Sequence, residues 1–149
     1  MSELSLTSSD FEDGGEIPKK CGYKHGNVEP ELHLEHTPSG TKAIAIVMDD
    51  PDAMKAVGKV WVHYLWYATY TDEEPGFLPD DEMIYGKTDF GEIGYGGPAP
   101  PDGRHTYIFK AYALDTVLDL DEGYSKQELE DAMKGHILGE AKLTGTFAP

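Results

Sequence analysis

The sequence predicts a mainly β fold, an antiparallel β-sandwich with one or two short helices, formed as a single domain over residues 1–149. Three observations lead to this prediction. The apolar runs are short and are separated by recurrent glycines and prolines. β-Branched and aromatic residues, which favour strands, are concentrated in a few of these runs. Only one segment has the spacing of an amphipathic helix, and 149 residues is the size of one domain.

The central strand is predicted at KAIAIVM, residues 42–48, which is apolar at both odd and even positions. That pattern is typical of a strand covered on both faces. The other predicted strands are β-branched, aromatic or alternating segments: LSLTS (4–8), ELHLEH (31–36), VWVHYLWYATY (60–70), HTYIFKAYAL (105–114) and AKLTGTF (141–147).

One helix is predicted at about residues 125–138. Ser125 and Glu128 have the spacing of a capping box, and Gly139 is a stop signal. Between them an apolar stripe recurs at helical spacing, on Leu129, Ala132, Met133, His136 and Ile137. Its position on the stripe predicts that His136 is a core residue.

Composition restricts the partners and the compartment. The chain has 28 acidic and 12 basic side chains, a formal net charge of −16, which argues against binding nucleic acid or an anionic membrane surface. A single cysteine, Cys21, excludes an intrachain disulfide and favours a reducing compartment. The first twenty residues do not resemble a secretory signal, and no apolar run reaches the roughly 20 residues of a membrane span. We therefore expect a cytoplasmic protein with no transmembrane segment.

Polar residues that can bind a ligand or take part in a reaction lie at the ends of the predicted central strands. Strand alternation places His105 and Tyr107 on one face of their strand, and Trp61 and His63 on one face of theirs. An Asp-Asp-Pro-Asp run, residues 49–52, follows the central strand. These groups converge only if the three strands are neighbours.

Three stretches, DDPDA, WVHYLWY and GYGGPAPPDGRHTYIFKAYALD, resemble the signature blocks of phosphatidylethanolamine-binding proteins, in particular the short bacterial and archaeal branch. The resemblance continues through FEDGGEIP, the predicted helix and the ending AKLTGTF, so it covers nearly the whole chain. It implies a central antiparallel sheet packed on a second sheet, with a small cavity at one end that binds phosphate and similar anions. From the residues themselves we expect no cofactor and no metal, because no cluster with metal-ligand spacing is present in the sequence. The ligand-binding residues that the resemblance implies are Asp50, Asp52, Trp61, His63, Gly96, Gly97, Pro98, His105 and Tyr107.

The chain departs from the family pattern at Met54, Ala68, Thr88 and Thr106, and in the stretch EPELHL, which puts ligand choice in question more than the fold. Relative to mammalian members, we also expect no additional helix after Pro149, so that the site is more open or is closed by a second subunit. An aromatic-rich surface near residues 64–70 is the expected place for a homodimer contact.

The residue types fit an anion pocket, because a carboxylate beside a histidine favours the charged imidazolium. His63 and His105 would then be charged donors, Tyr107 a neutral donor, and loop amides further donors. Asp50 would repel a dianion, so it would have to orient a histidine or accept from a protonated oxygen. The structural alternatives are that Asp52 only forms a turn and that Trp61 is a core residue.

The leading functional hypothesis is a non-enzymatic protein that binds a small phosphate-bearing or other anionic ligand and regulates a partner protein. Members of the similar family act on kinases and proteases, but no residue of this sequence identifies the partner. One alternative is an acid–base or metal-dependent hydrolase, because Asp50, His63 and His105 have the composition of such a site. No nucleophile motif accompanies these residues. Another alternative is a serine-protease inhibitor that acts through a surface loop.

Overall fold

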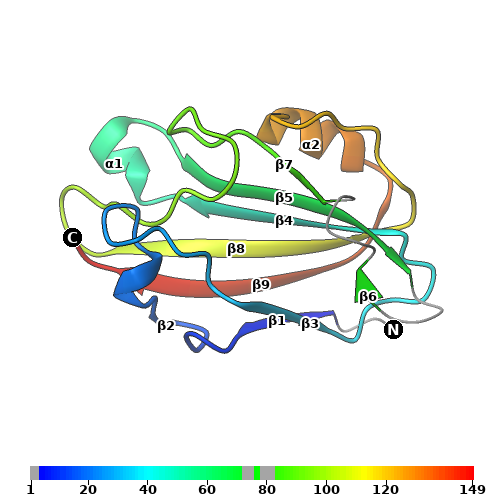
Figure 1. The fold of residues 1–149 in the computed structure, drawn as a ribbon, viewed down its shortest axis with the longest axis horizontal. Helices are drawn as coiled ribbons and strands as arrows, with labels where there is room; N and C mark the ends of the chain where they lie inside the picture. Colours follow the sequence, from blue (N-terminus) through cyan, green and yellow to red (C-terminus); the bar gives the residue numbers. More distant parts are fainter. Residues whose placement is uncertain (1–3, 72–75, 78–82) are drawn as a thin grey trace.

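The computed structural model describes residues 4–71, 76–77 and 83–149. Figure 1 shows the long strands β4, β5, β8 and β9 side by side, with α1 towards one end of these strands and α2 towards the other. The elements in chain order are β1 (Ser5–Ser8), β2 (Gly15–Glu16), a 3₁₀ helix (Lys19–Cys21), β3 (Leu32–Glu35), β4 (Ala43–Asp50), α1 (Ala53–Val57), β5 (Trp61–Thr71), β6 (Gly76–Phe77), β7 (Met83–Tyr85), β8 (His105–Leu114), α2 (Lys126–Met133) and β9 (Ile137–Phe147).

The large sheet has the strand order β2-β9-β8-β4-β5-β6, with β7 paired to β5, and a separate two-stranded sheet consists of β1 and β3. All of these pairings are antiparallel except the short one between β2 and β9. The mainly β fold class predicted from the sequence is confirmed. β4 lies between β5 and β8, which makes it the centre of the sheet.

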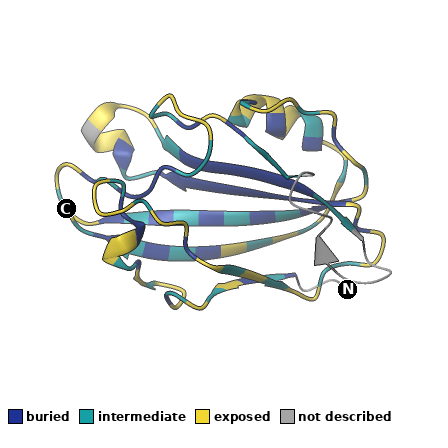
Figure 2. Ribbon diagram, viewed as in Figure 1, coloured by how far each residue is buried: buried dark blue, intermediate teal, exposed yellow. Residues whose placement is uncertain are grey.

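β4 is buried along its whole length, as the apolar segment at 42–48 predicts (Figure 2). Its even-numbered apolar residues belong to a core cluster that also includes Leu4 and Leu6, at the start of the chain. Its odd-numbered apolar residues belong to a second cluster with Leu129 and Met133 of α2. The sheet therefore has a core on each face, because β1 and the N-terminal segment cover one face and α2 covers the other.

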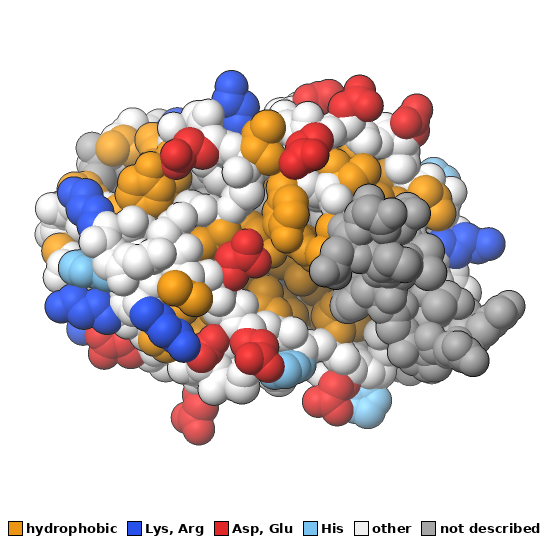
Figure 3. All heavy atoms as spheres, viewed as in Figure 1, with side chains coloured by type: hydrophobic (Ala, Val, Ile, Leu, Met, Phe, Trp, Pro, Cys, Tyr) orange, Lys and Arg blue, Asp and Glu red, His pale blue; other side chains and the backbone are white. Residues whose placement is uncertain are grey.

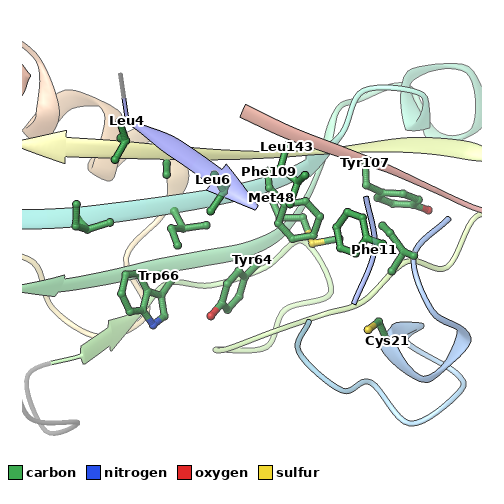
Figure 4. Packing of buried hydrophobic residues seen from close by; sticks show 14 of the residues in the cluster. Leu4, Leu6, Phe11, Cys21, Met48, Tyr64, Trp66, Tyr107, Phe109 and Leu143 are labelled. Carbon is green, nitrogen blue, oxygen red and sulfur yellow. The ribbon is translucent and has the colours of Figure 1, made fainter. Parts of the chain in front are cut away.

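Figure 4 shows the first of these clusters, which runs along the sheet from Leu4 and Trp66 to Tyr107 and Cys21. Burying each large apolar side chain contributes about 1.5–3 kcal/mol. Trp66 is 8% exposed and Tyr64 5% exposed, so most of their side-chain surface is buried within this chain and is not available for contact with a second copy. The expectation of an exposed aromatic surface at residues 64–70 was therefore wrong for these side chains, since β5 is a central strand.

The helix predicted at 125–138 is shorter than expected. Its capping box is confirmed, because Ser125 accepts from the Glu128 amide and Glu128 accepts from the Ser125 amide. The helix ends at Met133, and Gly135 follows it with a φ of +83°, which favours glycine. Ile137 begins β9, an eleven-residue strand that ends at Phe147 and pairs with β8 at ten positions.

The predicted core role of His136 was also wrong. Its side chain is 45% exposed, and its Nδ1 lies 2.9 Å from Asp115 Oδ1. The apolar stripe extends past the true helix end because Ile137, the first residue of β9, happens to match the helical spacing. In the part of the chain that the structure describes, no helix is long and apolar enough to cross a membrane.

Candidate functional site

The topology brings the three chemistry-bearing segments to one end of the sheet. β4 runs antiparallel to both of its neighbours, so its last residue lies beside their first residues. Asp50, at the end of β4, pairs in register with Trp61, the first residue of β5. His105 is the first residue of β8, on the other side of β4. The condition that these strands be neighbours is met.

A cavity of about 170 Å³ opens at this end of the sheet. Strand ends supply its polar groups, and α1 and the loops that precede β8 supply apolar walls. The lining residues are Asp50, Ala53, Val57, Trp61, His63, Phe90, Ala99, Pro101 and His105.

His105 is held between two carboxylates. Its Nδ1 lies 2.6 Å from Asp50 Oδ2 and its Nε2 lies 2.6 Å from Asp102 Oδ1. Burial alone would lower the pKa of this imidazole, but the hydrogen bonds and charges of the two carboxylates outweigh burial and raise it. Because ionised carboxylates only accept, this geometry favours a ring that donates from both nitrogens, which is the charged imidazolium, and Asp50 orients it.

His63 has the opposite character. Its ring is buried, and its Nδ1 lies 2.7 Å from the carbonyl oxygen of Gly96. Because a carbonyl only accepts, Nδ1 carries the hydrogen, and Nε2 of the neutral ring is a hydrogen-bond acceptor. Burial lowers the pKa of His63, and the bond to Gly96 and the charge of Asp50 offset this only in part. This direction runs against the expectation that His63 is a charged donor, because burial outweighs its partners.

Three buried polar atoms near the cavity lack a hydrogen bond of ordinary geometry among the described residues. They are Asp50 Oδ1, Trp61 Nε1 and the Tyr107 hydroxyl. Buried polar groups are ordinarily paired, and the Tyr107 hydroxyl lies close enough to Asp50 and to the backbone of Ala99 for both to act on it as hydrogen-bond partners. Trp61 Nε1 is therefore the buried donor that is left without a described partner. Burial, and after it the charge of Asp50, raises the pKa of Tyr107, so its hydroxyl keeps its proton.

Tyr107 lies behind the cavity and does not line it. It is fully buried, and its ring packs against both histidines, with centroids 5.1 Å from His63 and 6.3 Å from His105. Phe90 completes the aromatic wall, with its ring edge-on to both Trp61 and His63 and its face stacked on Tyr23.

Asp52 also does not line the cavity. Its Oδ2 accepts a hydrogen bond of 2.8 Å from the backbone amide of Thr106. Asp52 lies just before α1, and Thr106 is the second residue of β8. The carboxylate therefore links the segment that leads into α1 to β8, the strand that begins with His105.

Gly96, Gly97 and Pro98 form a second layer behind the lining residues Ala99 and Pro101. The amide of Gly96 donates to the His63 carbonyl, and that of Gly97 donates to Asn27 Oδ1. These two amides are thus not free donors for a ligand, contrary to the expectation. A Cβ on Gly97 would lie 1.9 Å from the carbonyl oxygen of Cys21, so the loop passes too close to the 3₁₀ helix for a side chain.

Sequence reasoning missed Asp102 and Phe90. Asp102 lies three residues before His105, directly after Pro101, and a carboxylate at that spacing beside a candidate ligand-binding histidine was a usable signal. Nothing in the sequence near Phe90 predicted its place, because a loop brings it to the pocket. Within the described ranges, no group of three or more His, Cys, Asp or Glu residues is arranged to hold a metal ion.

Comparisons with known proteins give a consistent result. The family described as phosphatidylethanolamine-binding protein matches residues 7–148. A UPF0098 protein of Methanothermobacter thermautotrophicus is 41% identical over 152 residues, covering 97% of this chain and 98% of that protein. A UPF0098 protein of Archaeoglobus fulgidus is 37% identical over 99% of this chain, which spans about half, 52%, of that longer protein.

Two solved structures have the same fold. A putative phosphatidylethanolamine-binding protein homolog from Chlamydia trachomatis matches with a TM-score of 0.85 at 35% identity, covering 98% of this chain and 97% of that one. YbcL of E. coli, described as a new member of the mammalian family, matches with a TM-score of 0.82 at 27% identity, covering 98% of both chains.

Proposed function

This chain belongs to the phosphatidylethanolamine-binding protein family, and we propose that its end-of-sheet pocket reversibly binds a small oxyanion that carries one negative charge and at least one hydroxyl hydrogen, such as a singly ionised phosphate group. The observation that supports this most directly is His105, held by Asp50 at the wall of the pocket with a carboxylate oxygen 2.6 Å from each ring nitrogen. Its ring attracts an anion, and the Asp50 carboxylate accepts a hydrogen.

The arrangement of donors and acceptors favours this ligand over a fully ionised one. His105 supplies positive charge, and Trp61 Nε1 is an unpaired buried donor. Asp50 Oδ1 and the neutral His63 Nε2 are acceptors, and a dianion offers them no hydrogen while being repelled by Asp50. A phosphate monoanion has both P–OH and P–O⁻ groups, so it can satisfy both kinds of partner.

The walls limit the size of the ligand. A water molecule takes about 30 Å³ of liquid, so the cavity of about 170 Å³ holds a group the size of about five or six waters. That is enough for a phosphate group and a short stem. The apolar side chains of Ala53, Val57 and Phe90 suit an apolar stem more than a second charge.

The proposed act is binding without a covalent step. Both nitrogens of His105 are engaged by carboxylates, and one nitrogen of His63 is engaged by a backbone carbonyl. Among the residues that the structure describes, no hydrogen bond joins either ring to a serine, threonine or cysteine side chain. The free thiol of Cys21 is buried, which is consistent with a cytoplasmic location as part of the same proposal.

The test is a titration of metal-free protein with inorganic phosphate and with O-phosphorylethanolamine at fixed ionic strength, followed by NMR of the imidazole signals. We expect saturable shifts at His63 and His105 and none at His136, which is the internal control on the far side of the molecule. His105→Gln keeps a neutral hydrogen-bonding side chain and should abolish saturable binding. Shifts that grow linearly without saturation, or that His105→Gln leaves unchanged, would refute the proposal.

A further inference from the structure

The two carboxylates that hold His105 differ in how firmly they are fixed. Asp50 is buried, with a side chain 4% exposed, whereas the side chain of Asp102 is 51% exposed. Both lie 2.6 Å from a ring nitrogen. One carboxylate is therefore a permanent part of the core, and the other reaches the histidine from the protein surface.

The position of Asp102 also allows its carboxylate to move away from His105. It follows Pro101, which lines the cavity, and precedes Gly103, which has a φ of +150° and open space around its Cα. Among the described residues, His105 is the only hydrogen-bond partner of the Asp102 carboxylate. A half-exposed carboxylate that gives up one ion pair is rehydrated by water, so its release costs little. Release of Asp50 would instead leave a buried charge unpaired.

We propose that Asp102 is an internal competitor for the anion, occupying His105 Nε2 in the empty pocket and exchanging with the ligand when it binds. This inference rests on the proposed function of the pocket. Nδ1 holds the buried bond to Asp50, so Nε2 is the nitrogen of His105 whose present partner, Asp102, can be exchanged for a ligand. The ligand anion and the Asp102 carboxylate therefore need the same hydrogen.

The exchange explains why the pocket would select a single charge. With Asp102 bound, His105 faces two carboxylates, and replacing one carboxylate by a monoanion leaves the local charge unchanged. A dianion would add one further negative charge within reach of Asp50. Asp102 thus lowers the affinity for every anion and sets the charge of the anion that can replace it.

The test compares wild type with Asp102→Asn, which keeps the shape and loses the charge, and with Asp102→Ala, which also loses the hydrogen bond. Asp115→Asn is a matched control, because Asp115 is a similarly exposed aspartate, 44%, paired with a histidine far from the pocket. Inorganic phosphate is titrated at about pH 6, where histidine is largely protonated. We expect both Asp102 variants to bind phosphate about three- to tenfold more tightly than wild type, and Asp115→Asn to bind like wild type.

A second readout does not depend on any ligand. In Asp102→Asn the pKa of His105, followed by NMR, should fall, because one of its two carboxylate partners is lost; in Asp115→Asn it should not change. If the pKa does not fall, the contact is not formed in solution and the competitor proposal fails by itself. It also fails if wild type binds phosphate and both variants bind it equally or more weakly. If neither wild type nor the variants bind phosphate, the proposed function fails, and the competitor proposal fails with it.

Discussion

The two pocket histidines should give this protein opposite responses to pH. His105 has a raised pKa in the folded state, because two carboxylates outweigh burial, so its stabilising contribution is complete below the unfolded value of about 6.5. That contribution is lost as pH rises through the higher folded pKa. His63 has a lowered pKa because of burial, so below about 6.5 the unfolded chain takes up a proton that the folded protein does not. Its effect is therefore a loss of stability as pH falls.

Urea unfolding of wild type, His63→Gln and His105→Gln across this pH range tests the assignment. We expect His63→Gln to be less sensitive than wild type to acid below about pH 6.5, and His105→Gln to lose the decline that wild type shows above it. His136→Gln is the control for removing a half-exposed histidine. Should both pocket variants change the same side of the pH profile, the opposite pKa directions would be contradicted.

At the scale of elements, the strands were predictable because their signals are local. The β4 segment is apolar on both parities and the β8 segment alternates, and both patterns follow directly from which faces are covered. The helix end was less predictable, because the stripe through Ile137 outweighed the glycine at 135. The contact of Phe90 with His63 and the hydrogen bond between Gly97 and Asn27 join residues far apart in the chain, so no local pattern reveals them.

The candidate site divides in the same way. Family blocks and strand alternation identified Asp50, His63 and His105, which the structure brings together at the end of β4. The sequence could not show that burial lowers the pKa of His63, because burial depends on what packs over the ring. It also could not show that the Gly97 amide is already bonded to Asn27.

The loop at residues 96–101, called the pocket loop here, allows a prediction at the scale of elements. Gly97→Ala places a methyl group 1.9 Å from the Cys21 carbonyl oxygen, so the loop or the 3₁₀ helix must move. We expect a loss of about 1–3 kcal/mol in the free energy of unfolding, together with weaker phosphate binding, because the shifted loop carries Ala99 and Pro101. Gly40→Ala is the comparison, since its site has open space and a φ of +91°, so only backbone strain contributes there. Equal binding by Gly97→Ala and wild type would show that the loop position does not set the pocket shape.

At the scale of the whole molecule, the charge balance dominates. Even if all 12 basic side chains were paired, 16 of the 28 acidic ones would have no basic partner. Figure 3 shows acidic side chains spread around the visible face. Some of the basic side chains already form ion pairs, Lys59 with Asp89 and Lys126 with Asp49. Repulsion among the remaining carboxylates therefore opposes the compact state, and the pocket must attract an anion through His105 against this field.

Salt should consequently stabilise the fold. Raising KCl from about 10 mM to about 150 mM shortens the screening length from about 30 Å to about 8 Å, which weakens repulsion between distant carboxylates more than it weakens close ion pairs. We expect the Tm at neutral pH to rise by about 2–5 °C, as measured by thermal unfolding. The same comparison near the sequence pI of about 4.5, where net charge vanishes, is the control, and there the rise should disappear. A Tm that falls with KCl at neutral pH would mean that the few ion pairs stabilise the fold more than the excess carboxylates destabilise it.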